Sequence, residues 1–111
     1  MTIYHPGLVQ GRWYQMRLLE QMANIGSEVE RAFQWKGKNN PDRAMKAFER
    51  ALELLDLTLQ SPDNKGRLKE IARTRELFVD AFLGENRFGP SEQSLQKYFL
   101  EFACAARKNR K

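Results

Sequence analysis

Few side chains in this sequence have types that could carry out catalytic chemistry. The chain contains one histidine, His5, and one cysteine, Cys104, with no glycine-rich phosphate loop, serine-nucleophile motif or zinc-binding helix motif. His5 lies beside Pro6 in an irregular segment, where nothing would hold it in place as a general base. Cys104 falls in an apolar helical pattern, which predicts a buried and inert thiol. We therefore predict that the protein is not an enzyme and binds no cofactor.

Carboxylates are the remaining source of metal ligands. Glu49, Glu53 and Asp56 follow one side of a predicted helix, and Lys46 and Arg50 lie among them. Mixed charges at this spacing usually form solvated pairs one helical turn apart. The Glu-x-x-His motif of di-iron bundles is absent from the chain. No metal ion is expected.

One cation stands within an apolar pattern and is therefore a candidate site residue. Arg75 occupies the position between two apolar layers of a helix predicted over residues 66–83. A buried, unpaired guanidinium costs several kcal/mol, so Arg75 should either extend to the surface or meet an acid. Asp56 and Glu20, on the two preceding helices, are the candidate partners. A buried ion pair is the expected arrangement, and a small-molecule-binding or enzymatic site around Arg75 is the alternative.

The net charge of +5 comes mainly from the end of the chain. Four basic residues lie among the last five, which leaves 15 basic against 14 acidic side chains elsewhere. A second row of basic residues runs along the third predicted helix, and acidic residues lie among them. The two sets could form one phosphate-facing patch only if they lie together, so we expect weak nucleic-acid binding at most. The candidate contacts are Lys65, Lys69, Arg73, Arg107, Lys108, Arg110 and Lys111.

The elements that must position these residues are helices. Apolar residues recur every three or four positions in four segments, with turn residues between them. The predicted helices cover residues 12–35, 41–59, 66–83 and 91–106. Residues 1–11 form an irregular lead-in, and residues 107–111 form a basic tail. Short loops between helices of this length favour an all-α fold with one domain, an antiparallel up-down-up-down four-helix bundle.

Local signals mark the start of the second helix and one close helix contact. Asn40 can cap a helix whose first residue is Pro41, and Gly37 is expected near the end of the preceding helix. Gly26 falls in an apolar stripe, where glycine costs about 1 kcal/mol relative to alanine. Such a glycine indicates that another helix approaches closely.

The apolar content also suggests association. Leu54 and Leu57 widen the stripe of the second helix beyond what one core requires, and Trp13, Tyr14 and Trp35 are aromatic residues beyond core need. We therefore predict a non-catalytic interaction module that forms a homo-oligomer, with weak nucleic-acid or protein-partner binding as a further possibility. No apolar run approaches the roughly 18 residues of a membrane span, and no leader segment is apparent, so a cytoplasmic protein is expected.

The order of features resembles a known family. The small-residue stretch at 21–26 and the alanine- and leucine-rich stretch at 51–55 are similar to the four-helix proteins encoded in ribosomal-RNA intervening sequences. The accessory variability protein of diversity-generating retroelements belongs to the same broad group. At residues 24–28, where that family has Asn-Ile-Ala-Glu-Gly, this chain has Asn-Ile-Gly-Ser-Glu. The resemblance implies a non-enzymatic bundle that forms ring-shaped homo-oligomers and has a basic surface for nucleic acid.

Overall fold

A computed structural model describes residues 13–84 and 92–108, and every regular element among them is helical. The predicted all-α class is therefore confirmed for the described residues. The elements are the 3-10 helix η2 (Trp13–Gln15), α1 (Leu18–Gly37), α2 (Pro41–Gln60), the 3-10 helix η3 (Pro62–Arg67), α3 (Leu68–Leu83) and α4 (Glu92–Lys108). His5, the rest of the predicted lead-in and the expected start of the fourth helix at residue 91 lie outside the described residues.

The first helix begins later and ends later than the sequence pattern predicts. Arg17 is extended at the helix start (φ −70°, ψ 156°), because the preceding η2 segment turns Trp13 into the core. At the other end, Gly37 is the last residue of the helix, as expected, and Asn39 takes the left-handed conformation (φ 59°). Asparagine tolerates this region better than most residues with a side chain, so Asn39 makes the turn into α2.

The start of α2 matches its local signals. The side chain of Asn40 accepts a hydrogen bond from the backbone N–H of Arg43 (3.2 Å), and Pro41 is the first helical residue. At the other end of α2, residues 62–67 form η3 and place Asn64 in the interior. The third helix therefore begins at Leu68, two residues later than predicted.

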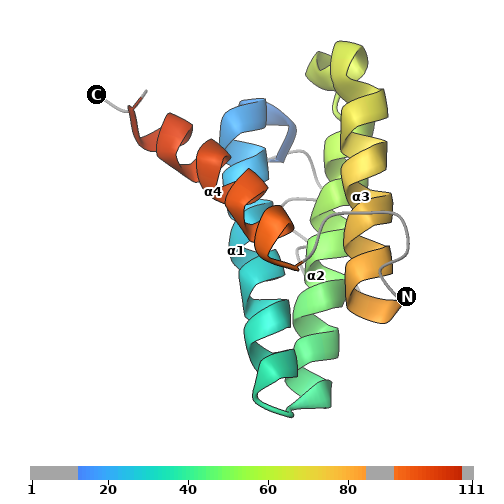
Figure 1. Cartoon of the computed structure of the whole chain (residues 1–111). Coiled ribbons are helices and arrows are strands. Elements are labelled where there is room, and N and C mark those ends of the chain that lie inside the picture. Colours follow the sequence, from blue (N-terminus) through green and yellow to red (C-terminus); the bar gives the residue numbers. More distant parts are fainter. Residues whose placement is uncertain (1–12, 85–91, 109–111) are drawn as a thin grey trace.

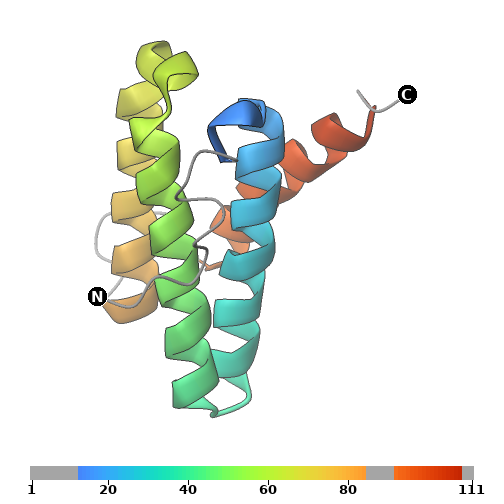
Figure 2. The ribbon, with the colours of Figure 1, turned by 180° about the vertical axis from the view of Figure 1, so that it is seen from behind.

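Three of the helices lie side by side, and the fourth lies across α1 (Figure 1). Figures 1 and 2 show α1 and α2 side by side, joined by a tight turn, with α3 alongside α2. The fourth helix packs mainly on α1 and crosses it obliquely, so that its C-terminal end points away from the other helices. The regular alignment expected for an up-down-up-down bundle is therefore not followed by α4.

A glycine marks the point where α4 crosses α1. A Cβ atom added at Gly26 would lie 2.7 Å from the Cβ of Phe99, far inside normal van der Waals separation. The interpretation of Gly26 as a site of close helix approach is confirmed. Without a side chain here, the i±4 ridges of two helices can cross closely at a large angle.

The core is centred on α2. Four phenylalanines from α1, α2 and α3 pack together, and the rings of Phe48 and Phe82 stack with centroids 4.4 Å apart. Leu54 and Leu57 are both buried, because α2 is covered by neighbours on two sides. The prediction of self-association assumed that Leu54 and Leu57 exceed what one core can bury, and that assumption is wrong.

Candidate functional site

Arg75 meets one of its two predicted partners. Its Nε lies 2.8 Å from Oδ1 of Asp56, which joins α3 to α2, whereas Glu20 pairs with Arg17, the residue that precedes α1 (3.1 Å). The side chains of Arg75 and Asp56 are 35% and 43% exposed. The pair therefore lies at the edge of the α2–α3 contact and is not the buried ion pair that the sequence suggested. Arg75 lies between two apolar layers of its helix, at the edge of the apolar face.

This exposure sets the expected energy of the pair. Solvent screens an ion pair that is more than a third exposed, so Arg75→Ala should lower the free energy of unfolding by no more than about 1 kcal/mol. Arg75→Met, which keeps an apolar stem, should cost less still. Urea unfolding of both variants measures this. A loss of about 3 kcal/mol in the alanine variant, the range of a buried pair, would contradict this placement.

A surface hollow lies beside this ion pair. Its volume is about 460 Å³, it is open to solvent, and Arg75, Val79, Asp80 and Leu83 are among the residues that line it. Leu83 is 57% exposed, and the Oδ2 atom of Asp80 is buried with no hydrogen-bond partner among the described residues. The alternative prediction, a small-molecule-binding or enzymatic site around Arg75, would use this hollow.

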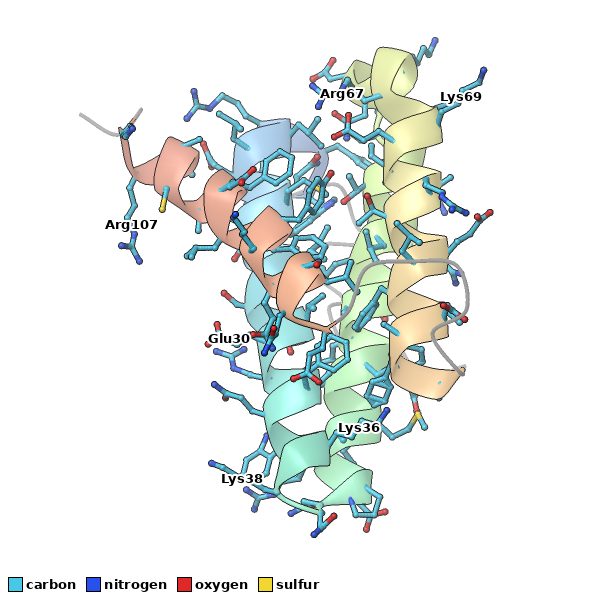
Figure 3. The ribbon with its side chains drawn as sticks, in the orientation of Figure 1. Glu30, Lys36, Lys38, Arg67, Lys69 and Arg107 are labelled. Atoms are coloured by element: carbon cyan, nitrogen blue, oxygen red, sulfur yellow. The ribbon has the colours of Figure 1, made fainter. Side chains whose placement is uncertain are left out.

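The two basic sets predicted from the sequence lie on opposite sides of the molecule. Figure 3 shows Lys69 on α3 and Arg107 at the far end of α4, with the other helices between them. Lys65 is exposed like Lys69, but Arg73 pairs with Glu76 (3.3 Å). The predicted joint patch is therefore not formed by the described residues, because the oblique course of α4 carries its end away from α3. Lys108 is exposed beside Arg107, while Arg110 and Lys111 lie outside the described residues.

Most arginines within the described ranges are held by carboxylates. The arginines that contact an acidic side chain are Arg17, Arg31, Arg50, Arg67, Arg73 and Arg75. In this part of the chain, only Arg43 and Arg107 lack such a partner. Arg43 lies over the indole ring of Trp35, and Arg107 lines a groove between α1 and α4. These two arginines mark the surfaces that sequence reasoning did not identify.

The first surface surrounds Trp35 at the turn between α1 and α2. The Arg43 guanidinium carbon is 4.7 Å from the ring centroid, and Lys38 Nζ is 5.3 Å from it. The neighbouring Lys36 is used differently, since its Nζ donates to the carbonyl oxygen of Phe82 (2.6 Å) at the C-terminal end of α3. That contact places a positive charge at the negative end of the helix dipole. The available sequence signal was the run of basic residues that follows this tryptophan, at positions 36, 38 and 43.

The second surface is the groove between α1 and α4, of about 160 Å³. Small residues form its floor at the Gly26 crossing, and Leu100 on its rim is 60% exposed. Glu30 on α1 and Arg107 on α4 carry opposite charges along its edges, and both lie on the same side of the molecule in Figure 3. Cys104, one helical turn beyond Leu100, is exposed. The prediction of a buried thiol is wrong, because α4 packs through another face.

A buried polar cluster ties the two 3-10 helices to α1 and α2. Trp13 Nε1 donates to Thr58 Oγ1 (2.9 Å), and Gln21 Nε2 donates to the carbonyl oxygen of Trp13 (2.9 Å). Asn64 Nδ2 donates to Gln21 Oε1 (2.9 Å) and to the carbonyl oxygen of Thr58 (3.0 Å). Trp13 is only 1% exposed, so its interpretation as an aromatic beyond core need is wrong. These hydrogen bonds are used within the fold, which makes the cluster an anchor.

Buried charge on α1 is also neutralised internally. Glu28 is 9% exposed, and its two carboxylate oxygens contact Arg31 Nη1 (3.1 Å) and Arg50 Nε (3.0 Å). Arg50 belongs to α2, so the pair joins the two helices. Each oxygen of this carboxylate therefore already contacts a cation within the fold. Within the described ranges, no group of three or more His, Cys, Asp or Glu side chains could hold a metal ion.

A second polar link joins α3 to α4. The hydroxyl of Tyr98 donates to Glu70 Oε1 (2.9 Å), and Arg67 Nη2 lies 2.7 Å from Glu70 Oε2. The hydrogen bond from Arg67 lowers the pKa of Glu70 against the opposing effect of burial, whereas burial raises the pKa of Tyr98. An apolar hollow of about 250 Å³ lies beside this link, between Leu77 and Leu95. The link positions α4, since its groups satisfy one another.

Comparisons of the chain with known protein families, curated proteins and solved structures find no match. The resemblance to the intervening-sequence proteins therefore stays a prediction. Of the helices that the structure describes, none has the length and apolar character needed to span a membrane.

Proposed function

We propose that this protein is a non-catalytic helical module that self-associates through the α1–α4 groove. The observation that carries the proposal is a combination of three side chains at one groove. They are an exposed leucine, Leu100, an acidic residue, Glu30, and Arg107, which contacts no carboxylate of the described residues. A large exposed apolar side chain beside a groove gains stability when a partner covers it. The proposed self-association therefore rests on this groove and not on the leucines of α2.

The charges along the groove favour a second copy of the chain as its occupant. In a dimer with two-fold symmetry, the same patch meets itself, so residue i contacts residue j and residue j contacts residue i. With the symmetry axis through the groove, Glu30 of each copy faces Arg107 of the other. Leu100 of each copy then covers the small residues around Gly26. Arg107 gains in this way the carboxylate partner that most of the described arginines already have.

Charge reversal tests this arrangement. Glu30→Arg and Arg107→Glu each create two like-charge contacts in a symmetric dimer, so each single variant should have a dissociation constant at least about tenfold above that of the parent. A mixture of the two single variants should form a heterodimer with near-parental affinity, because both contacts are then attractive. Light scattering and sedimentation equilibrium over a dilution series measure the masses.

Two further variants make the result specific to the groove. Leu100→Asp should weaken association, whereas Leu68→Asp, a matched change at an exposed leucine of α3, should leave it unchanged. The thiol of Cys104 should react with a maleimide more slowly as association proceeds, since it lies on the same face of α4 as Leu100. A parent that remains a monomer at every concentration, or a mixture that shows no rescue, would refute the proposed interface.

The small-molecule alternative would use the hollow beside Arg75. In its favour are the charged side chains of Arg75 and Asp80 among the residues that line this hollow. Against it, the guanidinium of Arg75 already donates to Asp56, and the hollow is an open surface. Ligand pockets usually enclose most of a bound molecule. The groove between α1 and α4 is therefore the better-supported site.

A further inference from the structure

We propose that the turn between α1 and α2 binds single-stranded nucleic acid, with Trp35, Lys38, Arg43 and Lys46 as its contact residues. We name this set the Trp35 corner. It lies apart from the α1–α4 groove, and it includes none of the basic residues that the sequence pattern suggested for nucleic acid. The inference is thus independent of self-association.

The first argument is the state of the charges at the corner. Residues 35–46 contain four basic side chains and one acidic side chain, Asp42. Lys36 is engaged by the carbonyl oxygen of Phe82, which leaves Lys38, Arg43 and Lys46, all exposed. None of these three contacts a carboxylate within the described ranges. The corner therefore presents a local positive field, in contrast to the α3 row, where acids offset the cations.

The second argument is that the aromatic ring holds the cations without neutralising them. Lys38, at the end of α1, and Arg43, in the first turn of α2, are brought to the same indole ring by the turn at Asn39. A cation–π contact orients a charged group but leaves its N–H donors available to phosphate oxygens. Long side chains that are already oriented lose less entropy when a ligand binds.

The third argument identifies the class of ligand. Trp35 is half-buried, and the exposed guanidinium of Arg43 lies over its ring. Single-stranded nucleic acids bind where basic residues contact the backbone and aromatic rings or arginine planes stack with bases. An acidic peptide would match the charges but has no aromatic bases to stack. The arrangement of ring and cations therefore favours single-stranded nucleic acid.

Tryptophan emission provides the test, because the chain contains only two tryptophans. Trp13 is buried, so quenching by added oligothymidylate or oligouridylate reports on Trp35. We expect binding at low salt with quenching of Trp35 emission. The double variant Lys38→Gln/Arg43→Gln should bind about tenfold more weakly, and its salt slope should fall by about 1.4, at about 0.7 for each lost phosphate contact.

A variant of equal charge on α3 decides between the two candidate surfaces. Lys69→Gln/Arg73→Gln removes the same net charge and should change the affinity by less than about twofold, measured by anisotropy of a labelled oligonucleotide. An equal or larger loss in the α3 variant would overturn the proposal in favour of general charge or of the α3 row. Unchanged Trp35 emission at saturation, absence of binding at low salt, or displacement of the oligonucleotide by equimolar polyglutamate would also overturn it.

Discussion

Asn64→Ala should lower the free energy of unfolding by about 3 kcal/mol, one of the largest effects expected for a single polar residue in this protein. Its amide nitrogen donates to Gln21 Oε1 and to the carbonyl oxygen of Thr58, and Asn64 is only 3% exposed. Truncation leaves the buried Gln21 Oε1 without this donor, while the carbonyl oxygen of Thr58 keeps only the hydrogen bond from the backbone N–H of Ser61 (3.3 Å). Each orphaned buried group costs about 1–3 kcal/mol.

The control for this prediction is another asparagine truncated in the same way. Asn24 is exposed and donates to the carbonyl oxygen of Glu20 within α1, so Asn24→Ala should change stability by no more than about 0.5 kcal/mol. Urea unfolding followed by circular dichroism compares the two variants. Equal midpoints for Asn64→Ala and Asn24→Ala would show that the polar cluster does not anchor the 3-10 helices.

Gly26→Leu should destabilise the protein by about 3 kcal/mol, through overpacking at the crossing of α1 and α4. A Cβ at position 26 would be 2.7 Å from Phe99 Cβ, an atom fixed directly to the backbone of α4. Rotating a side chain cannot relieve that contact, so the two helices must separate. Gly26→Ala should cost about 1 kcal/mol, because the better helix propensity of alanine offsets part of the clash.

Gly37 supplies the matched control for this effect. It lies in the same helix, and a Cβ added there would meet nothing within 4 Å. Gly37→Ala should therefore be neutral or stabilise the protein by up to about 1 kcal/mol. Thermal and urea unfolding of the three variants measure the differences. If Gly26→Leu melts at the same temperature as the parent, α4 does not cross α1 as closely as described.

The local chemistry of the sequence determined most of the helical elements. Apolar spacing predicted four helices, and Asn40 with Pro41 predicted the start of α2 to the residue. Gly26 indicated a close helix contact. These features depend on backbone hydrogen bonding and on periodicity within about four residues, which a sequence states directly. The later start of α1 was missed because the inward turn of Trp13 depends on a partner 45 residues away.

Only the tertiary structure decided how the faces of these helices meet. Helix packing made Asp56, and not Glu20, the partner of Arg75. It also buried Leu54 and Leu57 and left Cys104 exposed. The choice of ion-pair partner and the burial of each side chain depend on the rotation of a helix about its axis and on its crossing angle. Neighbouring residues of a helix differ by about 100° around that axis, so a modest rotation moves a side chain between core and solvent.

The candidate sites illustrate the same division between sequence and structure. Lys38, Trp35 and Arg43 are visible in the sequence as basic residues around a tryptophan, but their meeting at one ring requires the left-handed turn at Asn39. Glu30 and Arg107 are 77 positions apart in the sequence, and only the oblique path of α4 brings them to one groove. Charge and amphipathic pattern are properties of the chain alone. The surfaces made from them depend on long-range packing, which sets where each helix lies.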